Sequence, residues 1–200
     1  MPTPRKTVGD RLILWVLRHS DVSHVDGIGI VDLRARGDSF LPTVQRALQL
    51  VREHDPRRYA RIVRHIKWIV NQVTAGKDIE YNERIRLCGV EFSEIPGLEN
   101  DVLAAAYACF LVHEATHGVI ASRGIKYSPQ NRTRIEHLCT TEHNRFAALL
   151  ATAEPARYPL ELLRWDFDAD QWKEAWSSNR LKAGLSILWR TLKDTKAEPE

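Results

Sequence analysis

The sequence has few of the features that mark several common protein classes. It contains three cysteines among 200 residues, Cys88, Cys109 and Cys139, which are widely spaced and include no Cys-x-x-Cys pair. An odd and dispersed set predicts neither a disulfide framework nor an all-cysteine zinc site, and it favours a reducing compartment. The sequence also has no glycine-rich phosphate loop and no Gly-x-Ser-x-Gly segment, so nucleotide hydrolysis and serine hydrolase chemistry have no supporting motif.

Long hydrophobic runs and a strong excess of one charge are missing as well. The longest uncharged stretch, 102–112, has eleven residues, well short of the about 20 that a membrane-spanning helix needs. The 29 lysines and arginines barely outnumber the 26 aspartates and glutamates, which gives a net charge of +3. We therefore expect a cytoplasmic protein with no membrane span and with no nucleic acid as its partner. The sequence indicates no particular oligomeric state.

Hydrophobic periodicity predicts an α+β protein that is mostly helical. Apolar residues recur at helical spacing over 8–19, 39–54, 56–65, 99–122 and 131–153. Two segments, 66–73 and 85–92, are rich in β-branched and aromatic residues and are expected to be strands. Because there is no repeat and no Gly/Ser-rich linker, we assign 1–200 to a single domain. Its catalytic core is expected at about 60–153, and a helical C-terminal extension at 156–195.

One motif inside the predicted 99–122 helix carries chemistry, His113-Glu114-Ala115-Thr116-His117. Positions i and i+4 of a helix lie one above the other, so both imidazoles can bind one metal ion while Glu114 projects beside it. Two imidazoles and a carboxylate suit zinc and leave one position for water. Glu114 would take the proton of that water as it attacks a polarised carbonyl. The simpler alternative is that His113 and His117 are core histidines with ordinary hydrogen-bond partners.

The segment His-Glu-Ala-Thr-His-Gly, inside an apolar helix that follows a candidate edge strand at 85–92, resembles the zincin metallopeptidases. A glutamate farther along resembles their gluzincin branch, and the resemblance covers roughly residues 60–150. It implies a zincin-like fold, with a small antiparallel sheet beside the HExxH helix and a second, ligand-bearing helix. It further implies one Zn²⁺ per chain, a peptide or protein substrate, and an edge strand that pairs with the substrate backbone. The sequence lacks the Gly-x-Met-Glu-Asn segment of the aminopeptidases in that branch.

Two glutamates compete to be the third metal ligand. Glu136 lies 19 residues after His117, a spacing that matches the aminopeptidase type of gluzincin, and we favour it. Glu142 is the rival because it falls at the centre of the apolar face of the predicted 131–153 helix. A carboxylate there would be a ligand, an acceptor that orients an imidazole, or the ion-pair partner of an arginine. His137 lies on the opposite face and is the weakest candidate.

The oxyanion that forms during peptide hydrolysis needs a hydrogen-bond donor, and Tyr127 and His143 are the candidates. The leading interpretation is a zinc metallopeptidase in which His113, His117 and Glu136 bind the metal and Glu114 is the general base. A second interpretation is a zincin-like protein that uses its metal for stability or for binding a partner and does not hydrolyse peptides. A third is a helical interaction protein without metal.

Overall fold

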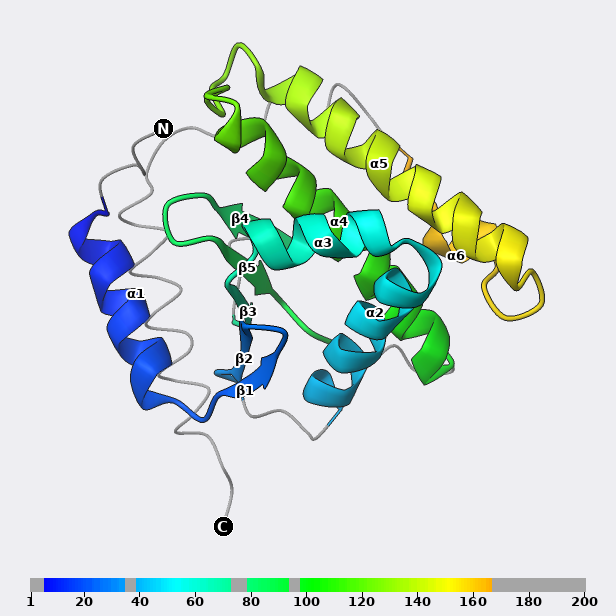
Figure 1. Cartoon of the computed structure of the whole chain (residues 1–200), viewed down its shortest axis with the longest axis horizontal. Helices are drawn as coiled ribbons and strands as arrows, with labels where there is room; N and C mark the ends of the chain where they lie inside the picture. The colour runs from blue at the N-terminus through cyan, green and yellow to red at the C-terminus, as the bar shows by residue number, and fades with distance from the viewer. Residues whose placement is uncertain (1–5, 35–38, 73–78, 94–97, 167–200) are drawn as a thin grey trace.

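The computed structural model describes residues 6–34, 39–72, 79–93 and 98–166 (Figure 1). It has an α+β fold that is mostly helical, as the periodicity predicts. Its elements in chain order are α1 (Val8–His19), β1 (Ser23–Val25), β2 (Ile28–Asp32), α2 (Phe40–His54), α3 (Pro56–His65), β3 (Trp68–Asn71), β4 (Ile79–Asn82), β5 (Leu87–Val90), α4 (Asn100–Ser122), α5 (Arg132–Ala153) and α6 (Leu160–Leu163). Most of the predicted extension, together with Trp172, Trp176 and Trp189, lies outside the described residues.

The five described strands form one mixed sheet in the order β1-β2-β3-β5-β4. The expectation of an antiparallel sheet was wrong, because β3 runs parallel to both β2 and β5. The chain passes through α2 and α3 between β2 and β3, and such a helical crossover brings the next strand back in the same direction. The predicted edge strand was also misplaced. The segment around β5 lies inside the sheet, and β4 forms the edge beside it.

The sheet separates α1 from the other large helices (Figure 1). Alternate strand residues face opposite sides, so that Val31 and Val70 pack with Leu17 of α1. Their neighbours Ile30 and Ile69 belong instead to the larger core that α2, α3 and α4 build on the other face. The helix α5 packs along the outer side of α4. The sequence of layers is therefore α1, the sheet, the group containing α2 to α4, and finally α5 with α6.

The central helix α4 is buried on nearly every side, which explains its uncharged first half. Asp101 lies in its first turn, where a negative charge is favourable, and Gly124 follows its end with a positive φ of 80°. By length and hydropathy α4 could span a membrane, but 72% of the relevant window is buried inside the protein. Such burial is typical of a core helix.

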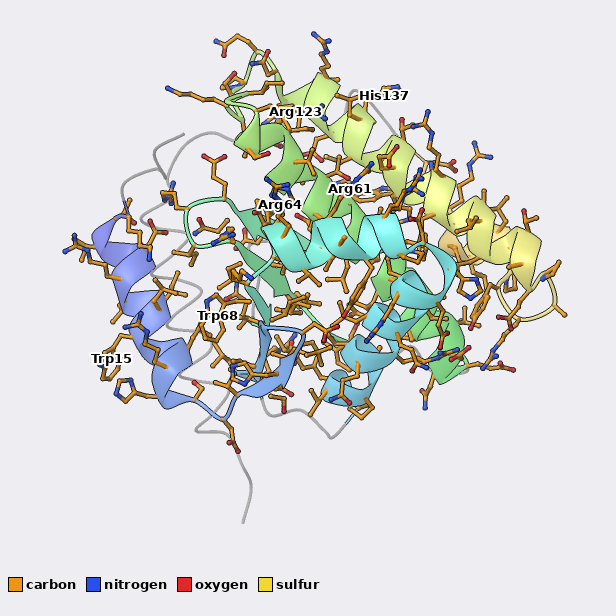
Figure 2. The ribbon with its side chains drawn as sticks, in the orientation of Figure 1. Trp15, Arg61, Arg64, Trp68, Arg123 and His137 are labelled. Atoms are coloured by element: carbon orange, nitrogen blue, oxygen red, sulfur yellow. The ribbon has the colours of Figure 1, made fainter. Side chains whose placement is uncertain are left out.

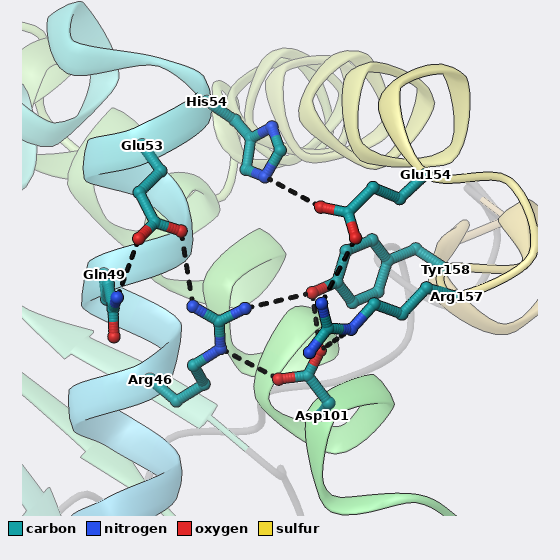
Figure 3. A network of polar contacts seen from close by, with 8 residues as sticks. All are labelled: Arg46, Gln49, Glu53, His54, Asp101, Glu154, Arg157 and Tyr158. Atoms are coloured by element: carbon teal, nitrogen blue, oxygen red, sulfur yellow. Dashed lines mark hydrogen bonds and ion pairs between the residues drawn. The ribbon is translucent and has the colours of Figure 1, made fainter.

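A network of polar contacts joins the N-terminal half of α4 to α2 and to the segment between α5 and α6 (Figure 3). Arg46 Nε donates to Asp101 Oδ1 at 2.8 Å, and the Tyr158 hydroxyl donates to Asp101 Oδ2 at 2.5 Å. Arg157 Nε lies 2.6 Å from the same Oδ2 atom. The carboxylate of Asp101 is thus shared by two guanidinium groups and a phenol, and the ring of Tyr158 is fully buried.

Candidate metal centre

Three side chains from two helices meet at a buried point in the C-terminal half of α4. The Nε2 atoms of His113 and His117 lie 3.2 Å apart, as expected from one helical turn. Oε2 of Glu136, from the second turn of α5, lies 3.3 Å from the Nε2 atom of His113 and 3.5 Å from that of His117. His113 and Glu136 are 2% and 4% exposed. Two helices packed side by side therefore bring the predicted third ligand to both imidazoles.

These distances allow a test of whether the three residues fit a zinc ion. Ligand atoms bonded to zinc at 2.0–2.1 Å in tetrahedral directions are separated by about 3.3 Å. The three measured separations, 3.2, 3.3 and 3.5 Å, agree with that value. Both imidazoles present the same kind of nitrogen to the carboxylate, so the donor set of two nitrogens and one oxygen suits zinc.

The hydroxyl of Tyr127 is hydrogen-bonded to the carboxylate of Glu136. Its hydroxyl donates to Oε1 at 2.5 Å, which leaves Oε2 to face the two imidazoles. Its ring also meets the ring of His117 edge-on, with centroids 5.8 Å apart. In this arrangement Tyr127 orients the carboxylate of Glu136, and its predicted role as an oxyanion donor would require this hydrogen bond to break.

Another side chain of a type that can bind metal lies beside the two histidines, and the sequence interpretation missed it. The Sγ atom of Cys139 and a ring nitrogen from each of His113 and His117 lie within 4.8 Å of one another. Cys139 is fully buried and hydrogen-bonded to His117. It follows Glu136 by three positions on α5, so both side chains lie on the same helix face. That spacing was the signal that could have identified it.

Aromatic rings and tight backbone packing form the walls around the cluster. The indole of Trp165 stacks on the imidazole of His113, with centroids 5.0 Å apart. Two hydrogen bonds of 2.9 Å hold the Trp165 backbone to the side-chain amide of Asn144 on α5. On the other side, a Cβ atom at Gly118 would lie 2.5 Å from Cβ of His65, so glycine allows α3 to approach α4 closely. The cluster is thus enclosed between α3, α5 and the segment after α6.

The electrostatics of the cluster distinguish its two histidines. Burial lowers the pKa of His113 to about 4, and its Nδ1 atom has no hydrogen-bond partner among the described residues. Burial also opposes the protonated form of His117, but the acidic neighbours Cys139, Glu136 and Glu114 outweigh that effect and raise its pKa. For Glu136, hydrogen bonds from both imidazoles outweigh burial and lower its pKa. The carboxylate of Glu136 thus favours a positive charge in the cluster, which an imidazolium or a metal ion could provide.

Glu114, the predicted general base, is buried with 4% of its surface exposed. Its charge raises the pKa of His117, Tyr127 and Cys139, which places it close to the cluster. It also influences Tyr81 of the edge strand β4, whose ring stacks on His117 with centroids 6.4 Å apart. Glu114 is thus close enough to both the cluster and Tyr81 for its charge to affect their ionisation.

The rival ligand Glu142 has other partners. Its carboxylate pairs with Arg58 at 3.0 Å and Arg61 at 3.4 Å, both from α3, and with Arg145 at 2.7 Å. The alternative of a structural ion pair is therefore confirmed, and Glu142 joins α3 to α5. His137 lies on the exposed face of α5, as predicted, and Figure 2 shows it near the outer edge of the molecule.

His143, the other candidate oxyanion donor, already has a hydrogen-bond partner in the described structure. Its Nε2 atom lies 2.8 Å from the carbonyl oxygen of Leu163, which can only accept, so Nε2 carries the hydrogen. Burial lowers its pKa to about 4, so the ring is neutral near pH 7 and its Nδ1 atom is an acceptor. The only donor of this ring is therefore already used to hold the segment that leads to Trp165.

No family model, no curated protein and no solved structure matches this chain.

Proposed function

We propose that this chain is a zinc-dependent metallohydrolase and, by its resemblance to zincins, a metallopeptidase. His113, His117 and Glu136 would hold one zinc ion per chain, and Glu114 would be the general base. The observation that carries the proposal is the meeting of three candidate ligand atoms with mutual separations of 3.2–3.5 Å, two from the His113–His117 motif and one from Glu136 on α5. Peptides or proteins would be the substrates, and a cytoplasmic location stays a prediction.

The residues around the ion have separable tasks in this proposal. Bound zinc would supply Lewis-acid chemistry and lower the pKa of a water molecule. The low pKa of His113 keeps its imidazole neutral and able to bind metal across the physiological range. Tyr127 fixes which oxygen of Glu136 faces the imidazoles. Glu114 would receive the proton of the attacking water and pass it to the leaving amine.

The edge strand β4 is the element best placed to align a substrate. It lies at the edge of the sheet, it contacts α4, and its Tyr81 ring stacks on His117. The outer backbone groups of an edge strand can pair with an extended peptide. We assign to β4 the substrate-pairing role that the resemblance suggested for 85–92. His117, whose side chain is 13% exposed, is the most accessible of the three ligands.

One observation favours a second candidate, a protein that uses the metal for stability without hydrolysing peptides. His113, Glu114, Glu136 and Cys139 are each less than 5% exposed. A site so enclosed suits a structural ion, because a substrate carbonyl must reach a catalytic one. The peptidase needs the carboxylate of Glu114 for hydrolysis, whereas a structural metal site does not.

The distinguishing experiment compares Glu114→Gln with Glu142→Gln. Both variants remove one negative charge from a helix next to the cluster, but Glu142 belongs to the ion pairs with the arginines of α3. The wild type and both variants are incubated with a mixed-sequence peptide library, new termini are counted by mass spectrometry, and zinc per chain is measured in parallel. We expect cleavage by the wild type and Glu142→Gln, and a loss of about 10²-fold or more in Glu114→Gln with zinc retained.

Three other results would count against the peptidase. Cleavage that is equal in Glu114→Gln and the wild type would remove Glu114 from the mechanism. Zinc retention with no cleavage of any peptide by the wild type would favour the structural role. Absence of zinc from the wild type after incubation with the metal would exclude both candidates.

A further inference from the structure

The cluster contains one more metal-binding side chain than the proposed mechanism uses. Cys139 lies on the same face of α5 as Glu136, and its sulfur lies within 4.8 Å of a ring nitrogen of each histidine. In a tetrahedral zinc site with a Zn–S bond near 2.3 Å, sulfur and nitrogen ligands are about 3.6 Å apart. The sulfur would therefore have to move by up to about 1.2 Å toward the two ring nitrogens to reach the distance of a ligand.

We propose that Cys139 is a fourth ligand of the same ion, so that the folded chain binds zinc through two imidazoles, one carboxylate and one thiolate. The inference rests on the proposed zinc site and deepens it. Four protein ligands complete a tetrahedral set and leave no position for water. Hydrolysis by the wild type therefore proceeds through the fraction of chains in which the sulfur has moved away from the ion.

Three observations support the thiol as a ligand rather than as a core side chain. Cys139 is hydrogen-bonded to His117, a contact that an inert buried cysteine does not need. It belongs to the small cluster of Ile120, Ile135 and Tyr127, which lies beside the site and apart from the main core. The other two cysteines are also fully buried, but they belong to the main core with apolar neighbours.

Binding of the metal ion by the sulfur of Cys139 needs no oxidant or reductant. The thiol loses its proton to solvent, the S–H bond is replaced by a sulfur–metal bond, and the sulfur supplies both electrons of that bond. Binding is therefore expected to release the thiol proton of Cys139. This proton leaves a cluster from which solvent is largely excluded, since only the His117 side chain exceeds one-tenth exposure among the four ligands.

The test uses Co²⁺ as the probe, added to the metal-free full-length protein under a phosphine reductant that brings no competing thiol. Tetrahedral Co²⁺ absorbs in the visible, and a thiolate ligand adds a charge-transfer band in the near ultraviolet. We expect both signals in the wild type and in Cys109→Ser, the matched control for a buried cysteine on α4. Cys139→Ser and Cys139→Ala are expected to keep the visible bands and to lose the charge-transfer band.

The results separate this inference from the proposed zinc site. Visible Co²⁺ bands in the wild type without the charge-transfer band would overturn the role of Cys139 and leave the three-ligand site standing. A charge-transfer band that persists in both Cys139 variants would also overturn it. Failure of the wild type to bind Co²⁺ at all would overturn the zinc site, and this inference with it. The wild-type spectrum alone decides the matter if a Cys139 variant fails to fold.

Discussion

Two polar clusters lie along the same buried helix, and they are stabilised in different ways. The network at the N-terminal end of α4 surrounds Asp101 with Arg46, Arg157 and Tyr158, so that its charges neutralise one another (Figure 3). The cluster near the C-terminal end instead brings together the nitrogens of His113 and His117 and an oxygen of Glu136. In the first cluster a carboxylate is paired with guanidinium groups of the same chain, whereas the second contains no lysine or arginine and would gain a positive charge from the proposed metal ion. The predictions below separate these two cases.

Metal removal is expected to have the largest effect on stability. A ligand that binds only the folded state stabilises it by about 4 kcal/mol at a free concentration 1,000-fold above its dissociation constant. Denaturant unfolding with zinc or with a chelator should show such an increment in the wild type and in Asp101→Asn, and none in His117→Ala. An equal zinc increment in His117→Ala would place the metal elsewhere.

Asp101→Asn is expected to lower the free energy of unfolding by about 2 kcal/mol near pH 7, because two guanidinium groups lose a charged acceptor. The loss should be the same with zinc and with a chelator, since the network and the cluster share no residue. Urea unfolding of the wild type and the variant measures it. A loss that depends on zinc would show that the two clusters are coupled.

The pH dependence of that loss follows from the pKa of Asp101. Hydrogen bonds from Arg46 and Tyr158 outweigh burial and lower this pKa in the folded protein. Stability from the ionised form is therefore fully present above the unfolded value near 3.8, and it disappears as the pH falls through the lower folded value. The difference between the wild type and Asp101→Asn should be constant from pH 7 to 5 and shrink below pH 4. If the stability difference already shrinks at pH 6, its pH dependence must come from a group other than Asp101.

Arg61→Ala is expected to have the smallest effect, within about 0.5 kcal/mol. The side chain of Arg61 is 52% exposed, and its ion pair with Glu142 spans 3.4 Å, while Arg58 holds the same carboxylate at 3.0 Å. Zinc content should not change. A larger loss, or a loss of zinc, would mean that Glu142 contributes to the metal centre after all.

Local patterns predicted the parts of the fold that depend on local physics. The long helices were recognised because apolar periodicity, Pro56 and Gly124 act over a few residues. The imidazole pair was recognised for the same reason, since one helical turn sets its geometry. The strands β1, β2 and β4 were missed. β3 and β5 are equally short, but they lie within eight-residue runs, 66–73 and 85–92, whose composition indicated strands.

Contacts between residues far apart in the sequence determined the partners of Glu142 and His113, and local patterns could not predict them. The helical pattern of α5 placed Glu142 among apolar positions, but Arg58 and Arg61 approach it from α3, more than 80 residues earlier in the chain. Hydrogen bonds between the Trp165 backbone and the Asn144 side chain hold the indole against His113. No rule of sequence spacing predicts this contact. Cys139 is the exception, since its position three residues after Glu136 could have shown it from the sequence.

The most direct test of the central claim is the zinc content of the protein purified without a chelator, measured by plasma mass spectrometry with His113→Ala and His117→Ala in parallel. The account predicts about one zinc per chain in the wild type and close to none in either variant. Asp101→Asn, which perturbs the other cluster on α4, should keep the wild-type content. A wild type that takes up no zinc even after incubation with the metal, or histidine variants that hold as much zinc as the wild type, would contradict it.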